Sequence, residues 1–132
     1  MIKKIDHVGI VVRDVEQATA IYRDGLGLKY LRTEHNEDFR CKIAFLQCGD
    51  VLIELIEPTG DGPSKKFLET HGEGIHHVCY EVDDIQKALE HAKTNLKTDY
   101  DEPKTGAGDS RVFFLDPSSV SSVETEFVEL KK

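Results

Sequence analysis

The stretch IDHVGIVVRDVEQATAIYRD (residues 5–24) recurs as IHHVCYEVDDIQKALEHAKT (residues 75–94), and the two copies align without a gap. Isoleucine, histidine and valine open both copies, and an aspartate in the tenth position precedes a helical pattern in both. Equivalent residues are 70 positions apart (77 − 7), slightly more than half of the 132-residue chain. Solenoid repeats are shorter, about 20–50 residues, so this repeat predicts a duplicated half-domain.

Each copy predicts a strand followed by a helix. Because side chains alternate along a strand, His7 and Val11 share one face of the first strand, and Val8 lies on the other. Asp14 and Asp84 are at N-cap positions, where a carboxylate accepts N–H groups of the first helical turn. Apolar residues then recur with helical spacing: Val15, Ala18 and Tyr22 in the first copy, and Ile85, Ala88, Leu89 and Ala92 in the second.

Three further strands are predicted after each helix. They cover 28–34, 41–47 and 51–57 in the first half, and a weak strand near 97–100, then 111–116 and 122–130, in the second. Gly49-Asp50 predicts a hairpin turn between two of them. We therefore expect a single α+β domain over residues 1–132, with βαβββ half-modules at 5–58 and 75–130 joined by a short helical connector at 63–72.

Two glutamates lie in the middle of apolar strands at equivalent places of the repeat. Glu54 falls within VLIELIE and Glu126 within VETEFVE, and they are 72 positions apart (126 − 54). A carboxylate among apolar side chains is costly unless it is paired or bound to a metal ion. Together with His7 and His77, the two glutamates form a set of donors that suits one octahedral divalent ion with two open positions: Co, Ni, Mn, Fe or Zn.

Each of these residues also has an ordinary structural interpretation. A strand histidine is commonly a hydrogen-bonded core residue, and a mid-strand glutamate commonly faces solvent. The metal site is favoured because the four candidates fall in two symmetric pairs, on strands that the repeat defines independently. His76 aligns with Asp6 and points to the opposite face from His77, so we expect it to pack rather than to bind metal. We assign no function to Glu57 or Glu124.

The composition argues against several classes of partner and site. A net charge of −8 disfavours binding to nucleic acid and to anionic membrane surfaces, and no apolar run approaches the ~20 residues of a membrane span. The three cysteines lack a C-x-x-C spacing, which argues against disulfides and a zinc-thiolate site. MIKK leads directly into the first strand without an apolar signal region, so a cytoplasmic location is expected.

Paired βαβββ modules with a histidine and a glutamate from each half resemble the vicinal oxygen chelate superfamily, which includes glyoxalase I, extradiol dioxygenases and bleomycin-binding proteins. Three segments are similar to the methylmalonyl-CoA epimerase family within it: IDHVGIVVRDVEQATAIYRDGLGL (5–28), IELIEPTGDGPSKKFLETHGEGIHHVCYEVDDI (53–85) and DEPKTGAGDSRVFFLDP (101–117). The resemblance implies a glyoxalase-like α+β fold, in which the two modules form a curved mixed sheet around a metal site. It places the metal ligands at His7, Glu54, His77 and Glu126.

The resemblance also implies a reaction. Methylmalonyl-CoA epimerases interconvert the C2 epimers of methylmalonyl-CoA through an enolate that a divalent metal ion stabilises. Removal of the C2 proton requires a general base within hydrogen-bond reach, and Glu126 is the candidate for one face of the substrate. The implied partner is a small acyl-CoA, and the implied assembly is a homodimer.

Two other functions are compatible with the same pattern. A lactoylglutathione lyase of the glyoxalase I type would use the same metal chemistry for a proton shift in a glutathione hemithioacetal. A metal-free drug-binding protein of the bleomycin-resistance type would bind by shape and stacking. The second is the less favoured, because the chain has no tryptophan and carries all four metal-donor residues.

Overall fold

The computed structural model describes residues 1–131, which form two compact units. The N-terminal unit is His7–His76, and the C-terminal unit combines Met1–Asp6 with the chain from His77 onward. The division differs from the predicted half-modules at 5–58 and 75–130, because the first residues of the chain join the second copy of the repeat.

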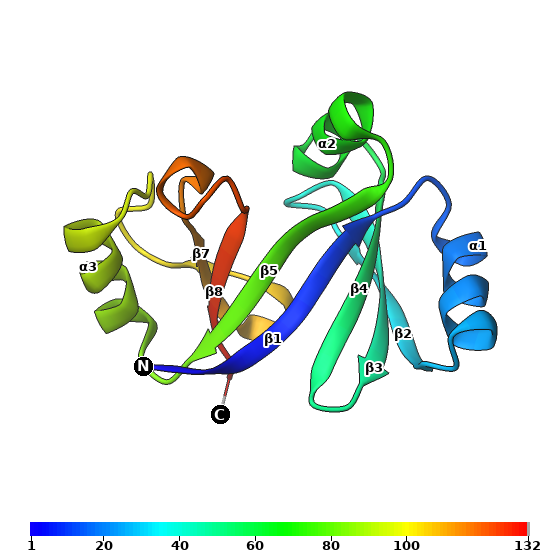
Figure 1. Cartoon of the computed structure of the whole chain (residues 1–132), viewed down its shortest axis with the longest axis horizontal. Coiled ribbons are helices and arrows are strands. Elements are labelled where there is room, and N and C mark those ends of the chain that lie inside the picture. The colour runs from blue at the N-terminus through cyan, green and yellow to red at the C-terminus, as the bar shows by residue number, and fades with distance from the viewer. Residues whose placement is uncertain (132) are drawn as a thin grey trace. The chain divides into compact units, whose positions relative to one another are not determined.

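The elements follow the predicted βαβββ order twice (Figure 1). The first series is β1 (Ile2–Val11), α1 (Val15–Ala20), β2 (Lys29–Asn36), β3 (Cys41–Cys48) and β4 (Val51–Pro58). The connector forms α2 (Pro63–His71), and the second series is β5 (Gly74–Val82), α3 (Ile85–Asn95), β6 (Lys104–Thr105), β7 (Arg111–Phe114) and β8 (Thr125–Glu129). None of the helices within residues 1–131 is long and apolar enough to cross a membrane.

The strands of the N-terminal unit are arranged in the order β2-β3-β4-β1. β3 runs antiparallel to both of its neighbours, whereas β4 is parallel to β1. The predicted hairpin turn is present between β3 and β4, with Gly49 at a φ of 62° that favours glycine. In the β1–β4 register, Gly9 lies opposite Glu54.

The C-terminal unit repeats this topology in the order β5-β8-β7-β6. β8 is parallel to β5, with Glu126 opposite Cys79, and β7 is antiparallel to β8 and β6. The mixed strand directions and the helix that accompanies each set of strands confirm the predicted α+β class.

The weak strand predicted near 97–100 was wrong, and the short strand of this region is β6 instead. In this region the side chain of Thr98, rather than a ladder of backbone groups, forms hydrogen bonds with two backbone groups. The hydroxyl of Thr98 donates to the carbonyl of Phe114 at 2.7 Å and accepts the N–H of Tyr100 at 3.2 Å. A segment bonded through a hydroxyl runs beside β7 without forming a ladder.

Each unit has a core between one helix and one face of its sheet. α1 lies against β3 and β4, and α3 lies against β7 and β8 (Figure 1). The buried residues around α1 are Val12, Val15, Ala18, Ala44, Leu46 and Leu55, and those around α3 are Val82, Ile85, Leu89, Ala92, Phe113 and Leu115. The helices therefore cover one face of each sheet, and the other face is left for a site.

In each unit, two carboxylates accept N–H groups at the start of the helix, α1 in the N-terminal unit and α3 in the C-terminal unit. The predicted N-caps are confirmed, since Asp14 accepts the N–H of Gln17 at 3.0 Å and Asp84 accepts that of Lys87 at 3.1 Å. A second carboxylate comes from a strand. The first helical N–H of α1 donates to Glu57 of β4 at 2.8 Å.

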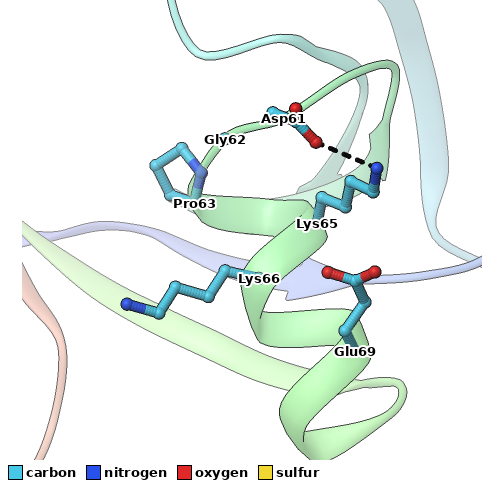
Figure 2. Close-up of a pocket in the computed structure, with 6 residues that line it drawn as sticks. All are labelled: Asp61, Gly62, Pro63, Lys65, Lys66 and Glu69. Atoms are coloured by element: carbon cyan, nitrogen blue, oxygen red, sulfur yellow. Dashed lines mark hydrogen bonds and ion pairs between the residues drawn. The ribbon is translucent and has the colours of Figure 1, made fainter.

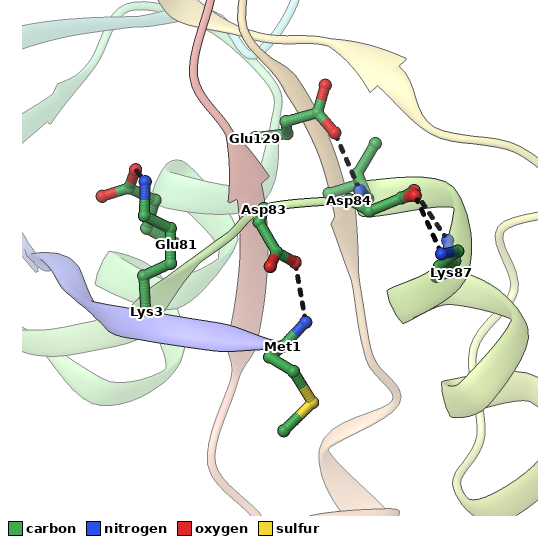
Figure 3. Close-up of polar contacts among 8 residues, drawn as sticks. Met1, Lys3, Glu81, Asp83, Asp84, Lys87 and Glu129 are labelled. Atoms are coloured by element: carbon green, nitrogen blue, oxygen red, sulfur yellow. Dashed lines mark hydrogen bonds and ion pairs between the residues drawn. The ribbon is translucent and has the colours of Figure 1, made fainter.

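The equivalent strand carboxylate of the C-terminal unit is Glu129 of β8, which accepts the N–H of Ile85 at 2.9 Å (Figure 3). Glu57 and Glu129 each follow a candidate metal ligand by three residues (57 − 54 and 129 − 126). The two strands that carry the candidate glutamates, β4 and β8, are thereby tied to α1 and α3.

The first residues of β1 are held to the C-terminal unit by charges. The amino group of Met1 lies 2.7 Å from Asp83, and Lys3 lies 3.3 Å from Glu81 (Figure 3). These ion pairs, with the bond from the Asp83 N–H to the Met1 carbonyl, explain why residues 1–6 belong to this unit.

Candidate metal centre

The N-terminal unit brings His7 and Glu54 together. Nδ1 of His7 is 3.1 Å from Oε2 of Glu54, and the two residues are only 6% and 8% exposed. His7 comes from β1 and Glu54 from the adjacent parallel strand β4. Gly9, directly opposite Glu54, has no side chain and leaves space beside the pair.

The C-terminal unit builds an equivalent pair. Nε2 of His77 is 3.3 Å from Oε1 of Glu126, and these residues are also 6% and 8% exposed. They lie on β5 and β8, the equivalents of β1 and β4 in the repeat. Each of the four predicted ligands is thus buried beside its predicted partner from the same unit.

We call the sheet face that carries the histidine and the glutamate, and that faces away from α1 or α3, the ligand face. In the N-terminal unit the ligand face is apolar apart from its β2 edge, where Arg32 lies 4.3 Å over the ring of Phe45. Phe45 lies directly opposite Glu54, and Cys41, Ile43 and Ile56 are buried in the same cluster, which α2 joins through Phe67 and Leu68. Burial raises the pKa of the Cys41 thiol to about 11, and the negative charge of Glu54 acts in the same direction. In the absence of a metal ion, this thiol therefore stays protonated at neutral pH.

The ligand face of the C-terminal unit is more polar. Glu124 precedes β8 and stands two residues before Glu126, so both side chains project from the same face. Burial raises the pKa of Glu124, His77 opposes that shift, and the charges of Asp116 and Glu126 add to it. Burial also raises the pKa of Tyr100, with further contributions from Glu126 and Glu124.

Tyr100 and Glu124 were not recognised as site residues from the sequence. Tyr100 lies beyond the aligned copies, in a segment predicted to be a strand, and its available signal was Tyr30, which stands 70 positions earlier. Glu124 carried one usable signal, its two-residue spacing from Glu126 on a strand.

His76, which we expected to pack, contacts the connector helix rather than a candidate ligand of its unit. Its ring lies edge-on to Phe67, with centroids 5.1 Å apart, and Phe67 is stacked on His71 at 4.8 Å. The arrangement agrees with a packing role.

A surface pocket lies at the start of α2 and contains none of the four candidate ligands. Its lining residues are Asp61, Gly62, Pro63, Lys65, Lys66 and Glu69 (Figure 2). Lys65 is paired with Asp61 at 2.9 Å. The pocket combines two acids with two lysines, so it offers no net charge to a ligand.

The donor atoms at the two pairs fit a divalent transition metal. Buried imidazole nitrogens and carboxylate oxygens are typical ligands of Zn, Fe, Co, Ni and Mn, whereas Ca prefers oxygen ligands alone. Neither glutamate could remain charged in an apolar face without a partner. The residues present therefore fit the group that the sequence predicted.

Comparison with known proteins identifies the class. The profile of the glyoxalase/bleomycin resistance protein/dioxygenase superfamily matches residues 6–114, and the chain belongs to this superfamily. Its homologues over nearly the whole length include methylmalonyl-CoA epimerases, which makes the chain a methylmalonyl-CoA epimerase-like enzyme, an isomerase.

Three relatives illustrate the match. The ethylmalonyl-CoA/methylmalonyl-CoA epimerase of Cereibacter sphaeroides is 36% identical over 134 residues, which are 98% of this chain and 100% of the relative. The mitochondrial methylmalonyl-CoA epimerase of Mus musculus is 34% identical, over 93% of this chain and 71% of its own. A solved structure of a Streptomyces coelicolor methylmalonyl-CoA epimerase with 2-nitronate-propionyl-CoA has a TM-score of 0.93 at 31% identity, over 100% of both chains.

Proposed function

We propose that this protein interconverts the C2 epimers of methylmalonyl-CoA with one divalent metal ion held by His7, Glu54, His77 and Glu126. The observation that carries the proposal is the repetition of a buried histidine–glutamate pair, with separations of 3.1 and 3.3 Å, in two units of the same topology. The full-length similarity to methylmalonyl-CoA epimerases supports the substrate.

The reaction is the removal of a proton from C2 and its return from the opposite side. A divalent cation bound by these residues would act as a Lewis acid for a thioester oxygen. Glu126 takes the C2 proton, because its carboxylate has a second oxygen beyond the one that faces His77. The C–H electron pair moves into the thioester as an enolate. Water then delivers a proton to C2 from the opposite side, and the hydroxide that forms takes back the proton held by Glu126.

The ligand face of the N-terminal unit suits the alkyl group at C2. Phe45, Ile43 and Ile56 are at most 9% exposed and lie in the cluster beside Glu54. An alkyl substituent that reaches this face would gain from the removal of apolar surface from water. At the β2 edge of this face, Arg32 lies 4.3 Å over the Phe45 ring and is paired with Glu34 at 3.0 Å.

Two measurements test the proposal. Elemental analysis of the purified protein should find about one first-row divalent metal ion per chain. In D₂O with methylmalonyl-CoA, the C2 proton signal in the NMR spectrum should decay at an enzyme-dependent rate that a chelator abolishes. Exchange no faster than the spontaneous rate would reject the epimerase, and the methylglyoxal–glutathione adduct would then test the lyase alternative.

The expected homodimer and the cytoplasmic location stay predictions. Light scattering on the eluted peak of a sizing column measures the first, and fractionation of the source cells measures the second.

A further inference from the structure

The segment after α3 places the ring of Tyr100 between Phe114, on the ligand face of the C-terminal unit, and the core cluster around α3. Thr98 fixes the backbone there, because its hydroxyl bonds both the Phe114 carbonyl and the Tyr100 N–H. The ring of Tyr100 lies 6.2 Å from that of Phe114 and also packs against the core cluster around α3. The ring is therefore held from two sides, and the position of its hydroxyl is restricted.

Phe114 connects this ring to the candidate ligands. It lies directly opposite Glu126 in the β7–β8 register, so the two side chains share the ligand face. Its ring also meets His77 edge-on, with centroids 6.1 Å apart. Tyr100 is thus one aromatic contact away from the histidine–glutamate pair, and its phenol feels the charges of Glu126 and Glu124.

A phenol in this position is a hydrogen-bond donor that keeps its proton at neutral pH. Removal of the C2 proton turns the thioester oxygen into an oxyanion, and a fixed donor aimed at such an oxygen stabilises the transition state more than the ground state. We propose that Tyr100 donates a hydrogen bond to the substrate oxygen that becomes the enolate oxyanion. This assignment rests on the proposed epimerase function and adds a catalytic residue to it.

The variant Tyr100→Phe tests the donor with little change in packing, because it removes the hydroxyl and keeps the ring against Phe114. Its matched control is Tyr80→Phe. Tyr80 is a half-buried tyrosine of the same unit whose ring packs against Phe127, on the face turned toward α3. We expect kcat of Tyr100→Phe to fall about 100-fold, with KM within about threefold of the parent, and the control to stay within about twofold of the parent.

The affinities for an anionic and a neutral ligand provide a second test. If Tyr100 had only a structural role, its substitution would not weaken the binding of one ligand and leave the other unchanged. Calorimetry should show that Tyr100→Phe binds 2-nitronate-propionyl-CoA, an anionic analogue of the enolate, about 100-fold more weakly, while it binds neutral propionyl-CoA as the parent does. The metal content of the variant should equal that of the parent.

Three outcomes would overturn the assignment. Equal kcat values for the two tyrosine variants would show that the hydroxyl is not used. A loss of metal in parallel with kcat would show that Tyr100 serves to orient Glu126 and does not contact substrate. A parent enzyme that neither turns over methylmalonyl-CoA nor binds the nitronate would reject the proposed function itself, and the role of Tyr100 with it.

Discussion

The two units hold the same pair of side chains in different surroundings. Both bury a histidine and a glutamate side by side, at 3.1 Å in one unit and 3.3 Å in the other. In the N-terminal unit the centre of the ligand face is apolar, α2 packs on it, and the paired Arg32 and Glu34 stand at its β2 edge. In the C-terminal unit, Tyr100 and Glu124 stand near the pair and a phenylalanine packs against the histidine.

The difference suggests how a duplicated module divides its tasks. The features common to both units are those that hold a ligand in place: the buried pair, the aspartate N-cap and the strand glutamate that accepts the first helical N–H. Tyr100 and Glu124, whose pKa values respond to the charge of Glu126, belong to the C-terminal unit. We infer that both halves bind the metal and that the C-terminal half performs the acid–base chemistry.

The largest expected effect is a loss of metal and turnover that should be the same for the two units. His7→Ala and His77→Ala should each release the metal and lower turnover at least about 1,000-fold, because a Lewis acid contributes several kcal/mol to the barrier. Elemental analysis and the C2 exchange rate measure both quantities. The exposed His35 and His91, one on β2 and one on α3, provide matched alanine controls. A His7→Ala variant that retained metal would show that the N-terminal pair is not a ligand pair.

The next effect, a loss of kcat, should differ between the two units. Glutamine keeps a carbonyl oxygen for the metal and removes the base, so Glu126→Gln should lower kcat about 100- to 10,000-fold. Glu54→Gln should lower it about tenfold, through a weaker charge at the metal. Steady-state kinetics with saturating substrate measures the ratio of the two effects. Losses of the same size would mean that the acid–base chemistry is not confined to the C-terminal unit.

A smaller effect, on the free energy of unfolding, should again be the same for the two units. Glu57→Gln and Glu129→Gln replace a charged acceptor at a helix start with a neutral one, and each should lower the free energy of unfolding by about 1 kcal/mol. The double variant should lose about the sum, because the two bonds have no shared partner. Urea unfolding of the metal-free protein measures this, with the exposed Glu90→Gln as control.

The smallest effect concerns thiols and leaves turnover unchanged. Only Cys48 is exposed, whereas Cys79 is fully buried and Cys41 is 4% exposed with a pKa of about 11. At pH 8 a thiol reagent should modify one cysteine in the native protein and three in 6 M urea, and Cys48→Ser should remove the native signal. Rapid labelling of Cys41 would show that water enters the ligand face of the N-terminal unit.

The repeat made most of the fold readable from the sequence. Alternation placed His7 and Val11 on one face of β1, and the spacing of Asp14 and Asp84 before apolar stripes located both helix starts. The stretch 97–100 could not be read in this way, because the hydroxyl of Thr98 supplies bonds that a backbone pattern does not reveal. The transfer of residues 1–6 to the C-terminal unit depends on ion pairs between distant residues, which no local pattern encodes.

The candidate site was readable only where the two copies agree. His7 and His77 were found at an offset of 70, Glu54 and Glu126 at an offset of 72, and all four side chains are buried. Tyr30 stands 70 positions before Tyr100, but both lie beyond the aligned copies at 5–24 and 75–94, so this match was not used. Glu57 and Glu129 do recur, but a strand glutamate that bonds a helix N–H looks in the sequence like any solvated carboxylate.

The division of β1 between the units has a consequence for synthesis on the ribosome. The N-terminal unit is continuous in the chain, whereas the C-terminal unit needs residues 1–6 and the chain from His77 onward. Asp83, which pairs with Met1, is added 82 residues later (83 − 1). At roughly 5–20 residues per second, the start of β1 waits about 4–16 s for its partner.

During that wait the segment MIKKID is an unpaired strand with two isoleucines, Ile2 and Ile5, and such a strand can associate with other nascent chains. The charges of Lys3, Lys4 and Asp6 interrupt it in the manner of gatekeeper residues, which keep an unavoidable apolar strand soluble until its partner arrives. The same Lys3 that interrupts this apolar segment before folding forms an ion pair with Glu81 in the folded protein.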